Sequence, residues 1–200
     1  GQGTDTIRWG VGQGQDIFTS QEGGDTVELR GTNAVDSVVI GTPATGTGVT
    51  LTASGATATV ESSVSRVLIS TLGGNDTVTV GTLTAAAGMT IEVDGGLNND
   101  TISAAGATLN GAAMILRGGI GNDTLTGSEE NDTLQGDSGD DNITGQDGDD
   151  SIDGGDGDDN IDGGEQNDVI TGGNGNDTLL GGANSDIISG DAGHDSVMGE

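Results

Sequence analysis

A nine-residue repeat constrains this chain more than any other feature of its sequence. From residue 118 onward, glycine returns every nine residues, with aspartate at the sixth place of each unit and an aliphatic residue at the eighth. Residues 154–180 hold three such units, GGDGDDNID, GGEQNDVIT and GGNGNDTLL. One inward aliphatic side chain per unit buries too little surface for a unit to fold alone, so successive units must stack on one another.

The repeat continues through nine units without interruption. We expect each unit to form a six-residue turn and a three-residue strand, with two units making one coil. Coils would then stack at the strand spacing of about 4.8 Å. The sixth-place aspartates are Asp123, Asp132, Asp141, Asp150, Asp159, Asp168, Asp177, Asp186 and Asp195. The eighth-place aliphatic residues are Leu125, Leu134, Ile143, Ile152, Ile161, Ile170, Leu179, Ile188 and Val197.

The same Asp-x-aliphatic signature occurs before residue 118 without the strict period. It is found at Asp5, Asp16, Asp25, Asp36, Asp76 and Asp100. These spacings predict larger coils, of about 20 to 24 residues, that lead into the compact repeats. We therefore divide the chain into an irregular parallel β-helix over residues 1–117 and a regular roll over residues 118–200. Asp100 and Asp76 are predicted to share the flank of Asp123, followed by a coil near Ala56 that lacks the acid, and then by Asp36 and Asp16.

The charge of the chain requires a cationic partner. It has 33 acidic residues against four basic ones, all arginine, and residues 118–200 hold 22 of the acids with no lysine or arginine. Such a polyanion will not bind nucleic acid or an anionic membrane surface, and no apolar run is long enough to span a membrane. No signal peptide or initiator methionine opens the chain, so we expect it to be a piece of a longer protein. One histidine without cysteine excludes disulfides and a conventional zinc site, which leaves a hard cation bound by oxygen.

The glycines and aspartates of each unit suit calcium. Glycine at the first, second and fourth places is expected to give positive φ and a sharp turn with inward carbonyl groups. Aspartates one strand spacing apart on the same flank repel each other by about 1–3 kcal/mol when nothing neutralises them. A cation between the turns attracts both carboxylates, so the net electrostatic energy becomes favourable. Ca²⁺ accepts a shell of carboxylate and carbonyl oxygens, whereas Mg²⁺ dehydrates reluctantly.

The repeat resembles the G-G-x-G-x-D-x-U-x nonapeptide of the RTX, or hemolysin-type calcium-binding, family. The close match covers residues 118–200, and a looser one extends toward the N-terminus. The resemblance implies an all-β fold, a right-handed parallel β-roll or β-helix solenoid with several Ca²⁺ ions between stacked turns. It further implies a bacterial protein, secreted by a type I system, that folds when it meets extracellular calcium.

The resemblance also implies a ligand set for each ion. One turn supplies its second- and fourth-place carbonyls and its aspartate, and the next turn on that flank supplies its first- and third-place carbonyls and its aspartate. The carboxylate ligands would be the nine sixth-place aspartates with Asp100 and Asp76, and Asp5, Asp16, Asp25 and Asp36 are further candidates. The carbonyl ligands would come from Gly119, Gly121, Gly136, Ser138, Gly145, Asp147, Gly154, Gly155, Asp156, Gly157, Gly172, Gly173, Asn174, Gly175, Gly190 and Ala192.

The two flanks differ at the fourth place of the unit. On the flank of Asp123 every fourth-place residue is glycine, whereas the other flank carries Glu130, Gly148, Gln166 and Asn184. If this place needs positive φ, Glu130 and Gln166 are each strained by roughly 1 kcal/mol. We therefore expect the flank of Asp123 to bind its ions more tightly.

Other interpretations of single residues point to structure rather than chemistry. The early aspartates, such as Asp5 and Asp25, can also be turn formers that bond to their own backbone. The additional acids Asp140, Asp149 and Asp158, and also His194, fit a solvated face. Arg66 and Arg117 could be catalytic in a polysaccharide lyase of the parallel β-helix type, but without lysine or clustered arginine we expect no enzyme activity here.

These observations favour a calcium-binding structural repeat region of a secreted or cell-surface protein. Two alternatives stay open: a C-terminal accessory module of a type I-secreted enzyme, such as a protease, lipase or alginate epimerase, and an adhesin or surface-layer segment. Thr and Ala in the strands of the irregular half favour the surface-layer kind. Calcium is the expected partner, and self-assembly or binding to a cell-surface polysaccharide stays open besides it. We expect neither nucleic-acid binding nor membrane insertion.

Overall fold

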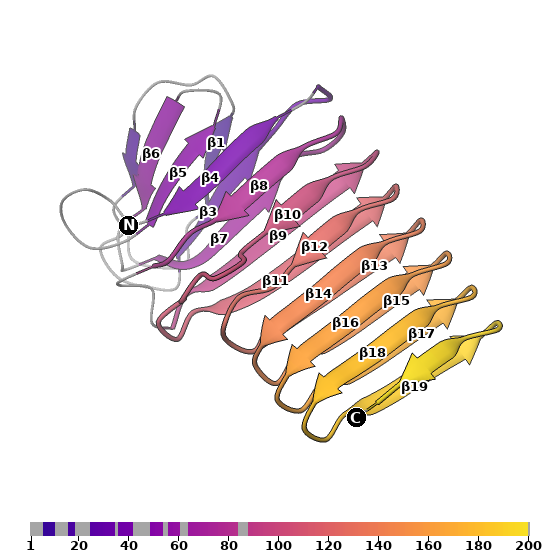
Figure 1. Ribbon diagram of the computed structural model, residues 1–200. Coiled ribbons are helices and arrows are strands. Elements are labelled where there is room, and N and C mark those ends of the chain that lie inside the picture. Colours follow the sequence, from indigo (N-terminus) through magenta and orange to yellow (C-terminus); the bar gives the residue numbers. More distant parts are fainter. Residues whose placement is uncertain are drawn as a thin grey trace.

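The chain folds into a solenoid of two β-sheets (Figure 1). The computed structural model describes residues 6–10, 16–18, 25–34, 36–41, 49–53, 56–60, 64–83 and 88–199. Within these ranges no segment is helical, and none could cross a membrane as a helix. The side chains of Asp16 and Asp25 lie outside the described part of the structure, as does Asp5 altogether.

The two sheets take alternate strands of the chain, except around an inserted hairpin. The first sheet has the order β1 (Thr6–Gly10), β3 (Asp25–Arg30), β7 (Val64–Ser70), β9 (Thr90–Leu97), β11 (Ala113–Ile120), β13 (Asp132–Ser138), β15 (Ser151–Asp156), β17 (Val169–Asn174) and β19 (Ile187–Ala192). The second sheet has the order β2 (Asp16–Phe18), β6 (Ala56–Val60), β5 (Val49–Ala53), β4 (Ser37–Gly41), β8 (Thr77–Val80), β10 (Thr101–Ser103), β12 (Thr124–Thr126), β14 (Asn142–Asp147), β16 (Asn160–Glu165), β18 (Thr178–Ala183) and β20 (Ser196–Met198).

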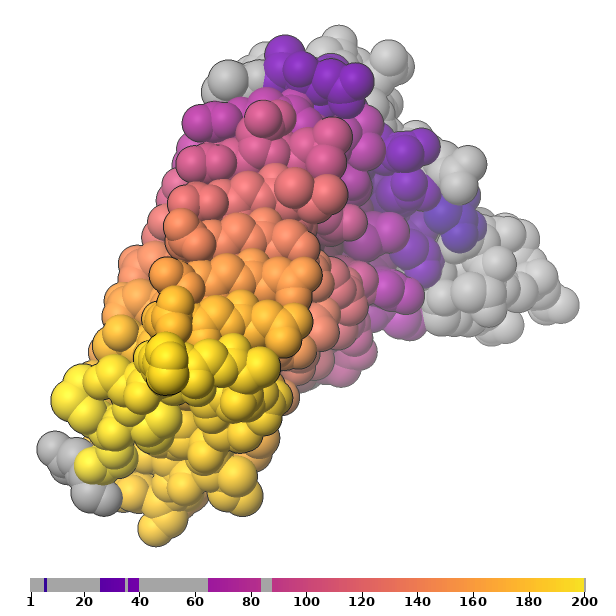
Figure 2. Space-filling model, turned by 90° about the vertical axis from the view of Figure 1, so that its right-hand side faces the viewer, coloured from indigo at the N-terminus to yellow at the C-terminus, as the bar shows by residue number. Residues whose placement is uncertain are grey.

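The register of the strands confirms the predicted parallel β-roll. Neighbouring strands of the regular part pair in parallel with an offset of two units, so that Ile143 lies beside Ile161 and Ile152 beside Ile170. Consecutive units therefore belong to opposite sheets, and each pair of units closes one coil. The coils follow one another in chain order along the solenoid (Figures 1 and 2).

The aliphatic residue of each unit forms the core between the sheets. Leu125, Leu134, Ile143 and Leu179 are completely buried, and Ile188 packs partly exposed against them. In the wider coils of the first half, branched residues such as Val67 and Ile91 continue the same row. Because each coil places its aliphatic residue directly over that of the coil before, the core is a narrow column of stacked side chains.

The strands of the roll are longer than the sequence pattern indicates. Those from β14 to β19 each have six residues, because the pairing continues past the aliphatic position into the glycines of the next unit. Gly155, for example, lies in register with Gly173. The predicted three-residue strand is therefore wrong. The first three places of the unit extend the strand, and only the fourth to sixth places form the tight turn.

The first half departs from the predicted stack around residues 49–60. Strands β5 and β6 form an antiparallel hairpin that lies between β4 and β2. The strand after Asp36 pairs directly with the strand after Asp76. The predicted acid-free coil between these two aspartates is therefore wrong. The hairpin accounts for the 40-residue spacing, because it leaves the coil and returns without adding a layer between them.

Candidate metal columns

The aspartates of the coils stack in two columns, one along each edge of the roll. The first column consists of Asp36, Asp76, Asp100, Asp123, Asp141, Asp159, Asp177 and Asp195. The second column consists of Asp132, Asp150, Asp168 and Asp186. Asp76, Asp100 and Asp123 thus lie on one flank, as predicted. Asp36 continues that flank directly.

One hydrogen bond repeats along both columns. The backbone N–H of each aspartate donates to Oδ1 of the aspartate in the next coil, at 2.7 Å from Asp100 to Asp123 and 2.8 Å from Asp141 to Asp159. The second column has the same bond, at 2.8 Å from Asp132 to Asp150. The side chain is therefore held at a fixed height in the stack. Its orientation is set by the backbone of the coil before it.

The second carboxylate oxygen of most column aspartates has no partner. Oδ2 is buried and accepts no hydrogen bond among the described residues in Asp76, Asp100, Asp123, Asp141, Asp150, Asp159, Asp168, Asp177 and Asp186. An ionised carboxylate oxygen buried without a donor is costly, and native proteins pair such atoms with hydrogen-bond donors, water or ions. The repetition of this atom along two columns indicates a repeated ligand rather than a local packing fault.

The first-place glycine leaves the space into which Oδ2 points. A Cβ added at Gly154 would lie 2.5 Å from the carbonyl oxygen of Gly172 and would also contact Oδ2 of Asp159. Gly163 stands in the same relation to the carbonyl of Gly181 and to Asp168. The first-place glycines do not have positive φ, so the predicted reason for them is wrong. They are needed because a side chain would fill the space between a carboxylate and a carbonyl.

A side chain at a first-place glycine should destabilise the roll. Gly154→Ala should lower the stability of the calcium-loaded chain by about 1–3 kcal/mol, because the added methyl group meets a backbone carbonyl that cannot move aside. Chemical denaturation in saturating calcium measures the change. Gly199→Ala is the matched control, since its Cβ would have nothing within 4 Å, and it should change stability by less than about 0.5 kcal/mol. Equal effects of the two substitutions would contradict the steric argument.

Burial of the columns disfavours their charge when no cation is present. Desolvation raises the pKa of Asp100, Asp141 and Asp150 to about 7, although each accepts a backbone hydrogen bond that lowers it. The neighbouring column carboxylates raise these pKa values further. Desolvation likewise raises the pKa of Asp159 to about 6. At neutral pH the columns therefore need a cation or protons.

The conformation of the fourth-place residue is uniform on the first flank and mixed on the second. The glycines of the first flank have φ between 134° and 151°, as in Gly139 and Gly193, which is a region open only to glycine. On the other flank Gly148 has a φ of 131°, close to the values of the first flank, whereas Gln166 and Asn184 have φ of 82° and 85°, near the left-handed helical region. Glu130 is absent from the residues with positive φ, so its predicted strain is wrong. Its carboxylate instead accepts hydrogen bonds from the backbone N–H groups of residues 110 and 111, at 2.8 and 3.0 Å.

The donor set of each interval between column aspartates suits Ca²⁺. An interval brings together two carboxylates and first-place carbonyls, which are all hard oxygen donors. No group of three acidic or histidine side chains converges on one point in the described residues, so main-chain oxygens would have to complete the shell. The third-place carbonyls of Ser138, Asp156 and Asn174 accept a bond from a fourth-place N–H. They would bind an ion through their second lone pair.

The exposed fifth-place residues form a further ladder that the sequence did not predict. Oδ1 of Asp140 accepts from the N–H of Asp158 at 3.0 Å, and Oδ1 of Asp158 accepts from the N–H of Asn176 at 2.7 Å. Asn176 in turn accepts from the N–H of His194. Asp140, Asp158 and His194 lie on the solvated face, as predicted. The acids and amides there also fix the height of one turn above the next.

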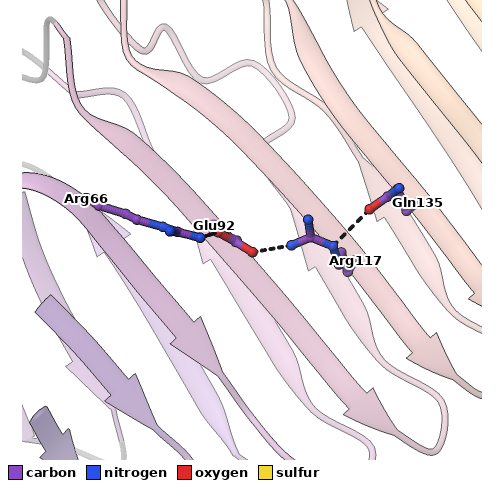
Figure 3. Close-up of polar contacts among 4 residues, drawn as sticks. All are labelled: Arg66, Glu92, Arg117 and Gln135. Atoms are coloured by element: carbon purple, nitrogen blue, oxygen red, sulfur yellow. Dashed lines mark hydrogen bonds and ion pairs between the residues drawn. The ribbon is translucent and has the colours of Figure 1, made fainter. Parts of the chain in front are cut away.

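Two of the arginines, Arg66 and Arg117, hold neighbouring strands of the first sheet together. Glu92 on β9 is 8% exposed and is paired with Arg66 on β7 and Arg117 on β11 (Figure 3). Nε of Arg117 also donates to the side-chain carbonyl of Gln135 on β13 at 2.8 Å. The four residues link four adjacent strands where the wide coils meet the regular ones. This arrangement gives Arg66 and Arg117 a structural role.

The fold and the columns define a class of protein, a parallel β-roll whose turns carry stacked, buried carboxylates. The family follows from the sequence of the roll. The family model described as RTX calcium-binding nonapeptide repeat (4 copies) matches residues 117–152, 135–170 and 162–197. Residues 117–197 are therefore RTX calcium-binding repeats, and the resemblance drawn from the sequence is confirmed for this region. No curated protein matches the chain.

Proposed function

We propose that the chain is a calcium-binding structural region of a secreted or cell-surface bacterial protein, and that it folds when it meets extracellular Ca²⁺. The observation that carries this proposal is the row of buried Oδ2 atoms without donors along both edges of the roll. These atoms are arranged for cations that repeat along both columns. RTX repeats are typical of secreted and surface proteins of bacteria. Such proteins meet the free calcium of the extracellular medium.

Calcium would act on folding through the charge of the roll. The repeat region has many acids and buries only one aliphatic residue per unit, so little apolar burial offsets the repulsion between coils. An ion between two coils would neutralise two carboxylates and cross-link two turns. Because the coils assemble the ligands, the free energy of binding is also free energy of folding.

The proposed ligands follow the two columns. The carboxylates would come from Asp76 to Asp195 in the first column and from the second column, while the carbonyls would come from the turns as the family pattern assigns them. The regular part, residues 118–200, would depend on calcium most strongly. The irregular part, residues 1–117, would form a separate section of the solenoid with wider coils.

We further propose that this region is not an enzyme. Arg66 and Arg117 are engaged with Glu92, so neither is free to act on a substrate. Carboxylates neutralised by a cation cannot serve as a general acid or base. The role of the region would then be mechanical, as a rigid rod whose length is set by the number of coils.

Circular dichroism with and without calcium tests the proposal. In excess chelator at neutral pH the chain should lose most of its β-structure, and adding Ca²⁺ should restore it in a cooperative transition. Mg²⁺ at the same concentration is the control and should restore little, since it holds its water shell more tightly. A chain that keeps its full β-signal in chelator would refute calcium-dependent folding.

A further inference from the structure

Two column aspartates differ from the others because a hydroxyl residue satisfies their Oδ2. Oδ2 of Asp132 accepts a hydrogen bond from the N–H of Ser128 at 2.6 Å and from its hydroxyl at 2.9 Å. Oδ2 of Asp36 accepts from the N–H of Thr32 at 2.7 Å and from its hydroxyl at 3.3 Å. The two pairs have the same spacing of four residues. Each stands at the N-terminal end of its column as far as the structure describes it.

A third hydroxyl lies one coil further along the first column. Position 71 is the first place of its turn, where the regular units carry glycine, and here it is threonine. The Thr71 hydroxyl donates to the carbonyl oxygen of Gly95 at 2.7 Å. In the next interval the corresponding carbonyl, that of Gly118, faces Oδ2 of Asp100 across Gly95, which has no side chain. The Thr71 side chain therefore takes up the space that the other coils keep free between carboxylate and carbonyl.

We propose that these hydroxyl side chains close the columns in place of calcium. The inference rests on the proposed calcium binding and restricts where the ions bind. Thr71 would exclude an ion from the interval between Asp76 and Asp100, and Ser128 would exclude one from the interval between Asp132 and Asp150. Thr32 satisfies Asp36 in the same way. Calcium would then bind in the first column from the Asp100–Asp123 interval onward, and in the second column from the Asp150–Asp168 interval onward.

The chemistry of the closures supports this division. Oδ2 of Asp36 and of Asp132 each receives two hydrogen-bond donors and so needs no cation, whereas Oδ1 of Asp132 and Oδ2 of Asp76 are buried without a partner. At Thr71 the support comes from the carbonyl side, because a hydroxyl proton directed at the carbonyl of Gly95 occupies a lone pair that a cation would use.

The surroundings of Ser128 agree, because the preceding segments on the same edge of the solenoid carry buried apolar residues, Leu83, Ala107 and Leu109. The N–H of Glu129, next to Ser128, donates to the carbonyl of Ala107.

Counting bound ions tests the proposal. Ser128→Gly and Thr71→Gly should each bind one more Ca²⁺ per chain than the unaltered protein, measured by native mass spectrometry in saturating calcium. Glycine removes the hydroxyl in both variants, and at position 128 it also permits the positive φ found at the second place of other turns, such as 110° at Gly155. Ser151→Gly is the matched control, since Ser151 is exposed on β15 and supplies no proposed ligand, and it should leave the count unchanged.

The possible results distinguish a failure of the proposed closures from a failure of the proposed calcium binding. An unchanged count in Ser128→Gly or in Thr71→Gly overturns the closure at that residue. If a variant does not fold in calcium, the unaltered protein decides: anomalous scattering from calcium between Asp76 and Asp100, or between Asp132 and Asp150, overturns the inference, and its absence there with signal at the other intervals supports it. A chain that binds no calcium at all refutes the proposed function instead.

Discussion

At about pH 5 and without calcium, the chain should recover much of the β-structure that it lacks at about pH 8. The column carboxylates have pKa values raised by burial, to about 7 for Asp100, Asp141 and Asp150. Protonation removes their charge and gives Oδ2 a proton to share with the nearby first-place carbonyl. Protons should therefore replace calcium in part, although they cannot cross-link the turns.

The sign of the effect follows from linkage. A carboxyl with a raised pKa in the folded state binds its proton more tightly there than in the unfolded chain, where its pKa is about 3.9. Its contribution to the metal-free fold is complete below about pH 4 and is lost as the pH rises toward 7. Calcium has the opposite dependence, because its ligands must be deprotonated, so its benefit should fade over the same range. Circular dichroism across this range, in calcium-free buffer, measures both trends.

Two adjacent aspartates provide a matched pair for this prediction. Asp150→Asn imitates the protonated form at a buried column position, so it should stabilise the metal-free fold at about pH 8 and weaken calcium binding. Asp149→Asn changes an exposed neighbour whose pKa is lowered by hydrogen bonds from Asn167, and it should do neither. A metal-free chain that is more ordered at about pH 8 than at about pH 5 would show that burial of the columns does not control folding.

The period of the sequence was sufficient to predict the stacked coils. A unit with one aliphatic residue can bury it only against the same residue in the next coil, and Ile143, Ile161 and Leu179 lie over one another accordingly. The length of the strands was not predictable from the pattern of side chains. Gly155 and Gly173 pair through their backbones, and glycine carries no side chain whose alternation could reveal a strand.

The carboxylate columns were predictable because their spacing repeats, whereas their closures were not. Asp100 and Asp76 retain the Asp-x-aliphatic signature, so their flank could be inferred from spacing alone. Ser128 stands in the unit GSEEND, whose departure from the repeat was the available signal. This irregular unit predicts backbone strain at Glu130, because the sequence does not reveal that the Glu130 carboxylate accepts hydrogen bonds from the backbone of residues 110 and 111 in the preceding coil. Nor could it reveal that β5 and β6 leave the stack as a hairpin.

Gly157→Gln should be among the most damaging single substitutions in the roll. Gly157 has φ of 137°, which only glycine adopts readily, and a Cβ there would overlap the carbonyl oxygen of Gly139 in the preceding coil. Strain and overlap together should cost about 3 kcal/mol or more. The calcium concentration at the folding midpoint should rise about threefold if about five ions bind as the roll folds, since the cost is shared among them and each 1.4 kcal/mol per ion corresponds to a factor of ten.

The reciprocal substitution on the other flank supplies the control. Gln166 occupies the same place of its unit with φ of 82°, so Gln166→Gly should relieve left-handed strain of roughly 1 kcal/mol, less the entropy that glycine gains in the unfolded chain. It should shift the weaker class of calcium sites toward higher affinity and leave the stronger class unchanged. Calcium titration of both variants, followed by circular dichroism, measures the two effects. If Gly157→Gln folds at the calcium concentration of the unaltered chain, or if Gln166→Gly leaves the weaker sites as they were, then fourth-place geometry does not set the affinity of the flanks.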